Sequence, residues 1–198
     1  MCLMDVRELV SQFGACDSQP ASDWQGDIPL PAEIARFYDE VGPLGESDRK
    51  GYLGVSMPGL GNDIELVPLA RLWKEQAGFR WDGRTNEPIA DWPSQWIALA
   101  WEGGTDTYVF DANTQTMLFS LAGSRIEDAY PINAGPIELV GALALFGQRI
   151  QEAGDDAMTE DYDYRPEWIE AVRKELVQEF GAAGEGIIKI STEEWPLQ

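Results

Sequence analysis

Residues 96–121 read WIALAWEGGTDTYVFDANTQTMLFSL, and this stretch decides the fold class. It opens with an unbroken apolar run, which is typical of a strand buried on both faces. After Gly103-Gly104, residues 105–110 alternate and are rich in β-prone types, and residues 116–121 alternate again beyond a polar loop. Three such segments joined by short turns predict an antiparallel meander.

Helical patterns flank the meander on both sides in the sequence. Segment 136–151 carries apolar side chains over a wide face, which predicts a helix buried against the sheet. Residues 187–190, Ile-Ile-Lys-Ile, predict a short terminal strand. We therefore expect an α+β fold, with helices packed mainly on one side of an antiparallel sheet and a C-terminal helical extension. Further helices are predicted at 6–13, 30–41, 68–77 and 165–180, short strands at 52–55 and 65–67, and loops at 17–28 and 78–94.

The charge balance excludes some classes of partner. The chain of 198 residues has 14 Lys and Arg against 35 Asp and Glu, a formal net charge of −21. Such a surface repels phosphate backbones and anionic membranes, so neither nucleic acid nor membrane is an expected partner. Complementary charge favours a basic protein partner. A solvated acidic surface with no partner is the alternative, and composition alone leaves both open.

Residue types that many catalytic sites need are missing. The sequence has no histidine, so it contains neither a Ser-His-Asp triad nor an imidazole-ligated zinc site. Cys2 and Cys16 could form at most one disulfide and would stay reduced in an ordinary cytosol. We expect no catalytic residue, no metal ligand and no cofactor.

The N-terminal residues give no targeting signal. Asp5 and Glu8 interrupt any apolar run there. A membrane span needs about 20 apolar residues, and no segment of the sequence comes near this length. The sequence therefore predicts a cytoplasmic protein.

Two motifs carry a family resemblance. The first is the helix start Leu30-Pro31 in the segment LPAEIARFY, with Gly42 beyond its end; the second is the strand WIALA, followed by a glycine turn and Asp106-Thr107-Tyr108. Together with the element order, they resemble the SUKH superfamily, which includes a fungal regulator of cell-wall synthesis and many bacterial toxin-immunity proteins. The resemblance covers residues 1–152. It leaves 153–198 as a C-terminal extension, expected to pack on the same domain.

The resemblance implies a fold and a binding role rather than an active site. Its first implication is a non-catalytic immunity protein that neutralises a cognate toxin by direct occlusion. The charge makes a basic toxin, such as a nuclease, the expected partner. The first alternative is a regulatory scaffold that binds several cellular partners. The second is a carboxylate-dependent hydrolase, which would need two close carboxylates in a concave pocket.

Acidic residues form the first candidate site. They crowd the stretch between two predicted helices and suit docking to a basic surface. A solvated linker, or a helix N-terminus enriched in acids, would have the same composition. The candidate contact residues are Asp155, Asp156, Glu160, Asp161 and Asp163.

Loop aromatics form the second candidate site. Trp81 and Trp92 lie in the predicted 78–94 loop beside acids, as interface anchors do, although such aromatics also pin a loop onto its own domain. Asp106, at the start of a predicted strand, either caps the turn or faces a partner. The remaining tryptophans of this region are predicted to fill the core, at positions Trp73, Trp96 and Trp101.

Overall fold

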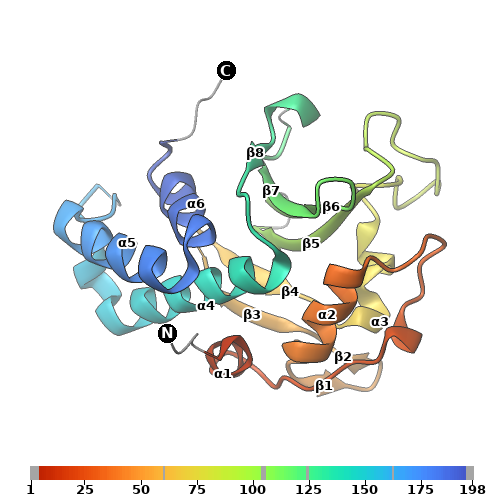
Figure 1. Ribbon diagram of the computed structural model, residues 1–198, viewed down its shortest axis with the longest axis horizontal. Coiled ribbons are helices and arrows are strands. Elements are labelled where there is room, and N and C mark those ends of the chain that lie inside the picture. Colours follow the sequence, from red (N-terminus) through yellow and green to blue (C-terminus); the bar gives the residue numbers. More distant parts are fainter. Residues whose placement is uncertain (1–4, 60, 104–105, 124, 162, 195–198) are drawn as a thin grey trace.

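A six-stranded antiparallel sheet forms the centre of the molecule (Figure 1). The computed structural model describes residues 5–59, 61–103, 106–123, 125–161 and 163–194. The strands follow one another in space in chain order, so the predicted meander is confirmed and extended at both edges. The strands are β3 (Val55–Pro58), β4 (Asp63–Leu66), β5 (Trp96–Glu102), β6 (Asp106–Asp111), β7 (Thr116–Ser120) and β8 (Tyr130–Pro131), and a separate hairpin pairs β1 (Ser47–Asp48) with β2 (Gly51–Tyr52).

Helices cover one face of this sheet, as the sequence predicts. Helix α4 lies at the centre and contacts β3 and β7, with α1 below it and α5 and α6 above it in Figure 1. Its central residues 139–147 are buried because its apolar side chains meet the sheet and four helices. The α-helices are α1 (Val6–Ser11), α2 (Ala32–Glu40), α3 (Leu69–Leu72), α4 (Pro136–Ala153), α5 (Pro166–Phe180) and α6 (Ala182–Ser191). Short 3₁₀ turns occur at η1 (Ala21–Asp23), η2 (Lys74–Gln76), η3 (Ile126–Asp128) and η4 (Gly154–Ala157).

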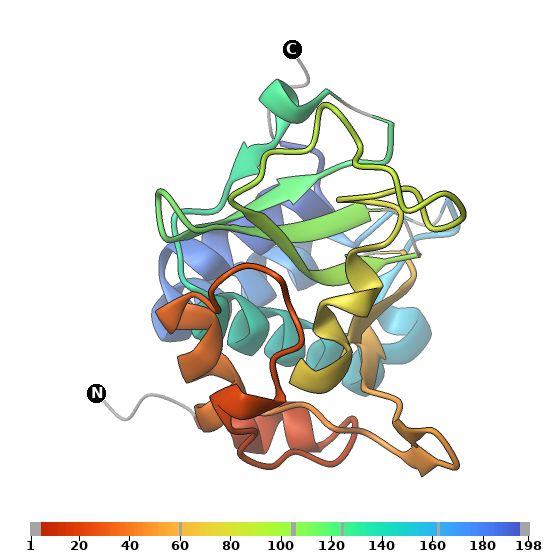
Figure 2. The same ribbon diagram turned by 90° about the vertical axis from the view of Figure 1, so that its right-hand side faces the viewer.

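Strand register assigns side chains to the two faces. Tyr108 pairs with Ala100 and Phe119, and all three belong to the hydrophobic core on the α4 face. The neighbouring residue Thr107 pairs with Trp101 and Ser120. Side chains alternate between faces along a strand, so these three residues lie on the opposite face. Within the part of the chain that the structure describes, no long helix lies on that second face. Figure 2 shows the loop between α3 and β5 in front of it, with α4–α6 behind the sheet.

A buried glutamine fixes the base of that loop. The side chain of Gln76 is fully buried; its amide donates to the Ala98 carbonyl at 2.8 Å and accepts from the Ala98 N–H at 2.9 Å. The contact lies at the irregular register between Ala98 and Ala100, where the β5 backbone departs from its ladder. The glutamine therefore satisfies sheet backbone groups and anchors the loop with one side chain.

The predicted terminal strand is wrong, because residues 187–190 lie within α6. Helices α5 and α6 pack against each other and both contact α4. Ile187, Ile188 and Ile190 are buried in this packing, so tertiary contacts override their β propensity. Gly184 permits the close approach, since a Cβ there would lie 2.3 Å from the Leu176 carbonyl oxygen.

Other predictions need smaller corrections. The predicted 68–77 helix is a short α3 followed by the 3₁₀ turn η2. The predicted 52–55 strand is interrupted, because β2 ends at Tyr52 and β3 begins at Val55. Of the tryptophans predicted as core, Trp96 is buried, whereas Trp73 and Trp101 are half-buried. Among the described residues, no helix is long and apolar enough to cross a membrane.

Candidate functional site

The loop of residues 77–95 is irregular but held by its own backbone. Gly78 N–H donates to the Trp81 carbonyl at 2.7 Å, and Asp82 N–H donates to the Glu87 carbonyl at 2.8 Å. The Asp82 carboxylate also accepts from the N–H groups of the residues that follow, Arg84 and Thr85. These bonds lower the pKa of Asp82, because they stabilise its charged form. The loop is therefore preorganised.

Aromatic rings pin the loop to the domain. Trp81 packs on Trp73 with ring centroids 5.2 Å apart, and Trp92 packs on Phe79 at 5.7 Å. Trp92 also meets Trp96 edge-on at 5.6 Å. One part of each indole thus fixes the loop. These contacts agree with the interpretation that such aromatics pin a loop onto its own domain. Both Trp81 and Trp92 nonetheless stay half-exposed, and their free surfaces line two hollows.

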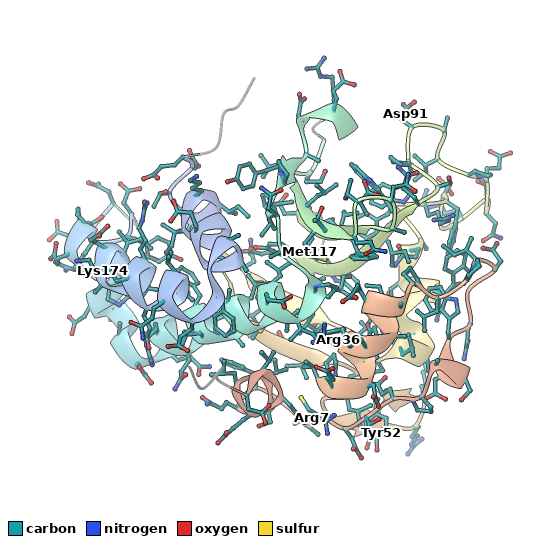
Figure 3. All side chains as sticks on the ribbon, viewed as in Figure 1. Arg7, Arg36, Tyr52, Asp91, Met117 and Lys174 are labelled. Atoms are coloured by element: carbon teal, nitrogen blue, oxygen red, sulfur yellow. The ribbon has the colours of Figure 1, made fainter. Side chains whose placement is uncertain are left out.

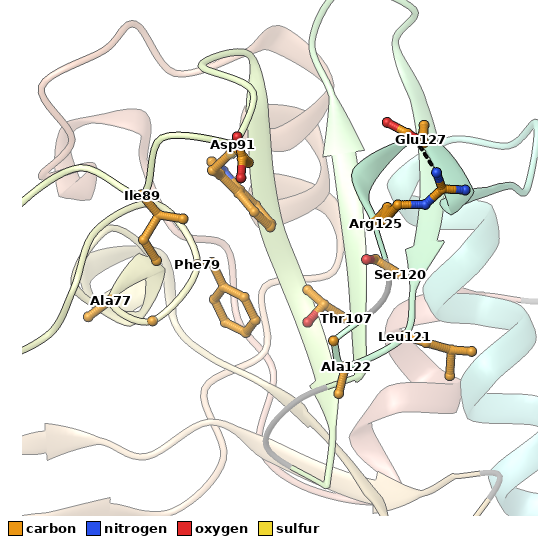
Figure 4. A pocket seen from close by; sticks show the side chains of 13 residues that line it. Ala77, Phe79, Ile89, Asp91, Thr107, Ser120, Leu121, Ala122, Arg125 and Glu127 are labelled. Atoms are coloured by element: carbon orange, nitrogen blue, oxygen red, sulfur yellow. Dashed lines mark ion pairs between the residues drawn. The ribbon is translucent and has the colours of Figure 1, made fainter.

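The larger hollow, which we call the groove, lies between the loop and the second face of the sheet (Figure 4). It has a volume of about 1040 Å³. Phe79 and Ile89 line its loop side, and Thr107 and Ser120 line its sheet side. Arg125 stands at the rim. Its guanidinium pairs with two neighbouring carboxylates, those of Glu127 at 2.8 Å and Asp128 at 3.0 Å.

The smaller hollow, which we call the tryptophan hollow, has a volume of about 500 Å³. Ile89 and Trp92 contribute to both hollows, so they form the wall between them. Polar side chains mix with the aromatic lining, and the Arg80 guanidinium lies 5.2 Å from the centre of the Trp73 ring. The lining includes the side chains of Trp73, Trp81, Trp92, Asp27, Arg80 and Asn86.

The predicted acidic residues lie together at the other end of the molecule. They occupy η4 and the turn before α5. In Figure 3, the labelled Lys174 on α5 marks this end of the molecule, and Asp91 marks the end with the 77–95 loop. All of them are exposed, and within the described part of the chain none of their carboxylates makes an ion pair or hydrogen bond. They are Asp155, Asp156, Glu160, Asp161 and Asp163. We call this group the acidic segment.

Half-buried aromatics border the acidic segment. Tyr164 stacks on Trp168 with centroids 5.2 Å apart and planes 21° apart, and both rings meet Phe146 edge-on. Burial raises the pKa of Tyr164 to about 12, with a smaller contribution from the Glu102 charge. The stack therefore stays neutral at physiological pH and adds apolar surface beside the carboxylates.

Asp106 makes a hydrogen bond within the domain. Its carboxylate accepts from the Ala122 N–H at 2.9 Å and so holds the chain where it leaves β7. This contact engages the segment after β7 and not the glycine turn before Asp106, so the turn-capping prediction stays a prediction; Ala122 itself lines the groove. Asp106 lies apart from the acidic segment.

Glu102 is the most buried carboxylate that the sequence analysis did not single out. It is 6% exposed, and one of its oxygens accepts from the N–H groups of Gly61 and Asn62 at 2.7 and 3.0 Å. These bonds tie the β3–β4 turn to β5. The hydroxyl of Tyr108 is buried and has no hydrogen-bond partner among the described residues. Over the same residues, no group of three or more Cys, Asp or Glu side chains is placed to hold a metal ion.

Sequence reasoning missed most residues of the two hollows. Phe79 and Ile89 share the loop with the predicted tryptophans, and their apolar character within a polar loop is the signal that could have identified them. No local pattern identifies Asp27 or Arg125, because they reach the site from distant parts of the chain.

Comparisons of the chain with protein-family models, with curated proteins and with solved structures give no match. The resemblance to the SUKH superfamily therefore rests on the motifs quoted for it.

Proposed function

We propose that this protein is a non-catalytic binding module for a basic protein, and that its partner is a cognate toxin which it neutralises by occlusion. The observation that carries the proposal is the acidic segment, whose exposed carboxylates have no internal partner in the described part of the chain. Carboxylates that serve the fold are engaged by backbone or arginine groups, as Asp82 and Glu175 are. The SUKH resemblance supplies the immunity role.

The mechanism is mimicry of phosphate charge. A nuclease holds its substrate in a cationic groove, and a row of carboxylates that covers this groove excludes the substrate. Long-range attraction speeds the encounter and weakens as salt screens it. The adjacent stack of Tyr164 and Trp168 supplies the apolar contact that sustains the complex.

The acidic segment and the loop tryptophans form two separate surfaces, since they lie at opposite ends of the molecule (Figure 1). This separation favours a second candidate, a scaffold that holds more than one partner. A toxin gene next to this gene favours the immunity role, and its absence favours the scaffold.

Co-purification with the product of the neighbouring gene, at low and high salt, tests the proposal. Neutralising Asp155, Asp156 and Glu160 to their amides should slow association by about tenfold at low salt, with little effect at high salt. A matched variant removes the same charge elsewhere, at the exposed positions Glu8, Glu46 and Asp63, and should change association far less.

Two results would contradict docking on the acidic segment. One is a complex whose association rate does not depend on salt. The other is an equal effect of the two charge-matched variants, which would mean that only the net charge matters.

A further inference from the structure

We propose that the tryptophan hollow binds a neutral saccharide. The hollow belongs to the end of the molecule that docking on the acidic segment leaves free. Its volume of about 500 Å³ lies within the range of small-molecule sites, about 300–1,000 Å³.

The lining combines broad apolar faces with polar groups. Indole rings of Trp81 and Trp92 supply rigid, flat surfaces. The C–H groups on one face of a pyranose ring pack against such surfaces, while its hydroxyls project outward and need hydrogen-bond partners. A mixed lining therefore fits a sugar better than it fits a wholly apolar ligand.

The polar groups of the hollow are free to bind. Within the described residues, the side chains of Asp27 and Asn86 make no hydrogen bond or ion pair. Arg80 donates to the Trp96 carbonyl at 3.2 Å and has further N–H groups to offer. A carboxylate accepts from hydroxyls, a guanidinium donates to them, and an amide does both, so the set matches a ligand whose groups are all hydroxyls.

The charges that line the hollow favour a neutral ligand over a cationic one. Among the described residues that line the hollow, only Asp27 and Arg80 are charged, and their charges cancel in a chain whose net charge is −21. Arg80 also already covers the Trp73 ring, 5.2 Å from its centre, so an internal cation occupies the ring face that an external one would seek. A basic side chain of a partner is therefore disfavoured here.

The site is preorganised, which reduces the entropy lost on binding. Ile89 N–H donates to the Arg80 carbonyl at 3.0 Å, so the two stems of the loop are paired beside the hollow. Asn86 has a φ of 59°, a left-handed conformation that asparagine tolerates, and it follows the turn capped by Asp82. The turn thus fixes the backbone position of Asn86 before a ligand arrives.

The test is titration of the full chain with neutral oligosaccharides. The probes are the cello-, laminari-, xylo-, chito- and malto-series, followed by tryptophan fluorescence and calorimetry. We expect saturable binding of at least one series, with an affinity that does not change with salt because the ligand carries no charge. The salt response also distinguishes this site from the proposed docking surface, so either proposal can fail alone.

Two variants locate the site. Trp81→Ala removes a stacking surface and should weaken binding by at least about tenfold. Asn86→Gly removes the amide but retains a residue suited to positive φ, so it keeps the loop and should also weaken binding. Tyr52→Ala, which removes an exposed ring outside the hollow, is the control and should bind as the unmodified protein does.

Three outcomes would overturn the proposal. The first is no saturable binding of any probe up to about 10 mM, beyond the weak affinities expected of single sugars. The second is binding that Trp81→Ala and Asn86→Gly leave unchanged. The third is binding of choline, tested in parallel, in place of every saccharide, which would show a cation site.

Discussion

The 77–95 loop and the acidic segment are both irregular connections, but different forces hold them. Buried contacts fix the loop: Gln76 anchors its base, and rings such as Trp92 pack on the sheet. The acidic segment is attached through a bridge between Met158 and Tyr164, and its carboxylates project into solvent. Packing contacts therefore determine the conformation of the loop, whereas exposed charge is the distinguishing property of the acidic segment. Substitutions should therefore affect stability at the loop and binding at the segment.

The largest effect is expected at the base of the loop. Gln76→Ala leaves the buried N–H and carbonyl of Ala98 without their side-chain partner and opens a cavity. We expect a loss of about 2–4 kcal/mol in the free energy of unfolding. Urea denaturation measures it, with the exposed Gln25→Ala as control. A loss equal to that of the control would mean that the loop is not anchored through this residue.

The next effect concerns the helices that follow the acidic segment. Gly184→Ala places a Cβ against the Leu176 carbonyl, which α5 cannot move easily, so α6 must shift. The expected loss is about 1–3 kcal/mol in thermal or chemical unfolding. Gly61→Ala is the matched control, because nothing lies within 4 Å of its added Cβ. Equal stabilities would contradict the close packing of α5 and α6.

A smaller effect is expected for the ion pair between α4 and α5. Arg149 Nε donates to Glu175 at 2.8 Å and lowers the pKa of that carboxyl, chiefly by hydrogen bonding. Glu175→Gln should cost only about 0.5–1 kcal/mol at pH 7, since solvent screens the partly exposed pair. A carboxyl with a lowered folded-state pKa stabilises above its unfolded pKa, and this stabilisation is lost as pH falls.

The difference between Glu175→Gln and the unmodified protein should therefore shrink between about pH 5 and about pH 3. Unfolding curves across this range measure it. A difference that grows on acidification would have the wrong sign for this ion pair.

The smallest effect on stability is expected at the acidic segment itself. Neutralising Asp155, Asp156 and Glu160 removes no internal contact in the described structure, so unfolding should change by no more than about 0.5 kcal/mol. Thermal unfolding checks this. A loss of several kcal/mol would show that the carboxylates serve the fold, and it would remove the main support for a docking surface.

Much of the sheet could be predicted from the sequence, because local patterns encode it. The alternation and turns of residues 96–121 gave β5–β7 in antiparallel order. The wrong prediction at 187–190 arose because isoleucines favour strands locally, whereas packing between α4 and α5 decides their conformation here.

The candidate site could be predicted only in part. Trp81 and Trp92 stand out as aromatics in a polar loop, and the structure places them on the walls of hollows. Their polar neighbour Asp27 comes from a different loop, and no pattern links segments so far apart in the chain. The separation of the acidic segment from the tryptophans is likewise a property of the tertiary fold.

The pairing of the 77–95 stems has a consequence for engineering. Gln76 and Trp92 clamp the two ends of the loop, while the tip at residues 83–87 is exposed and contributes nothing to the core. A foreign sequence grafted into that tip would be displayed on a rigid base and should not destabilise the sheet. The domain therefore offers this loop as a position for diversified sequence, much as a recognition scaffold does.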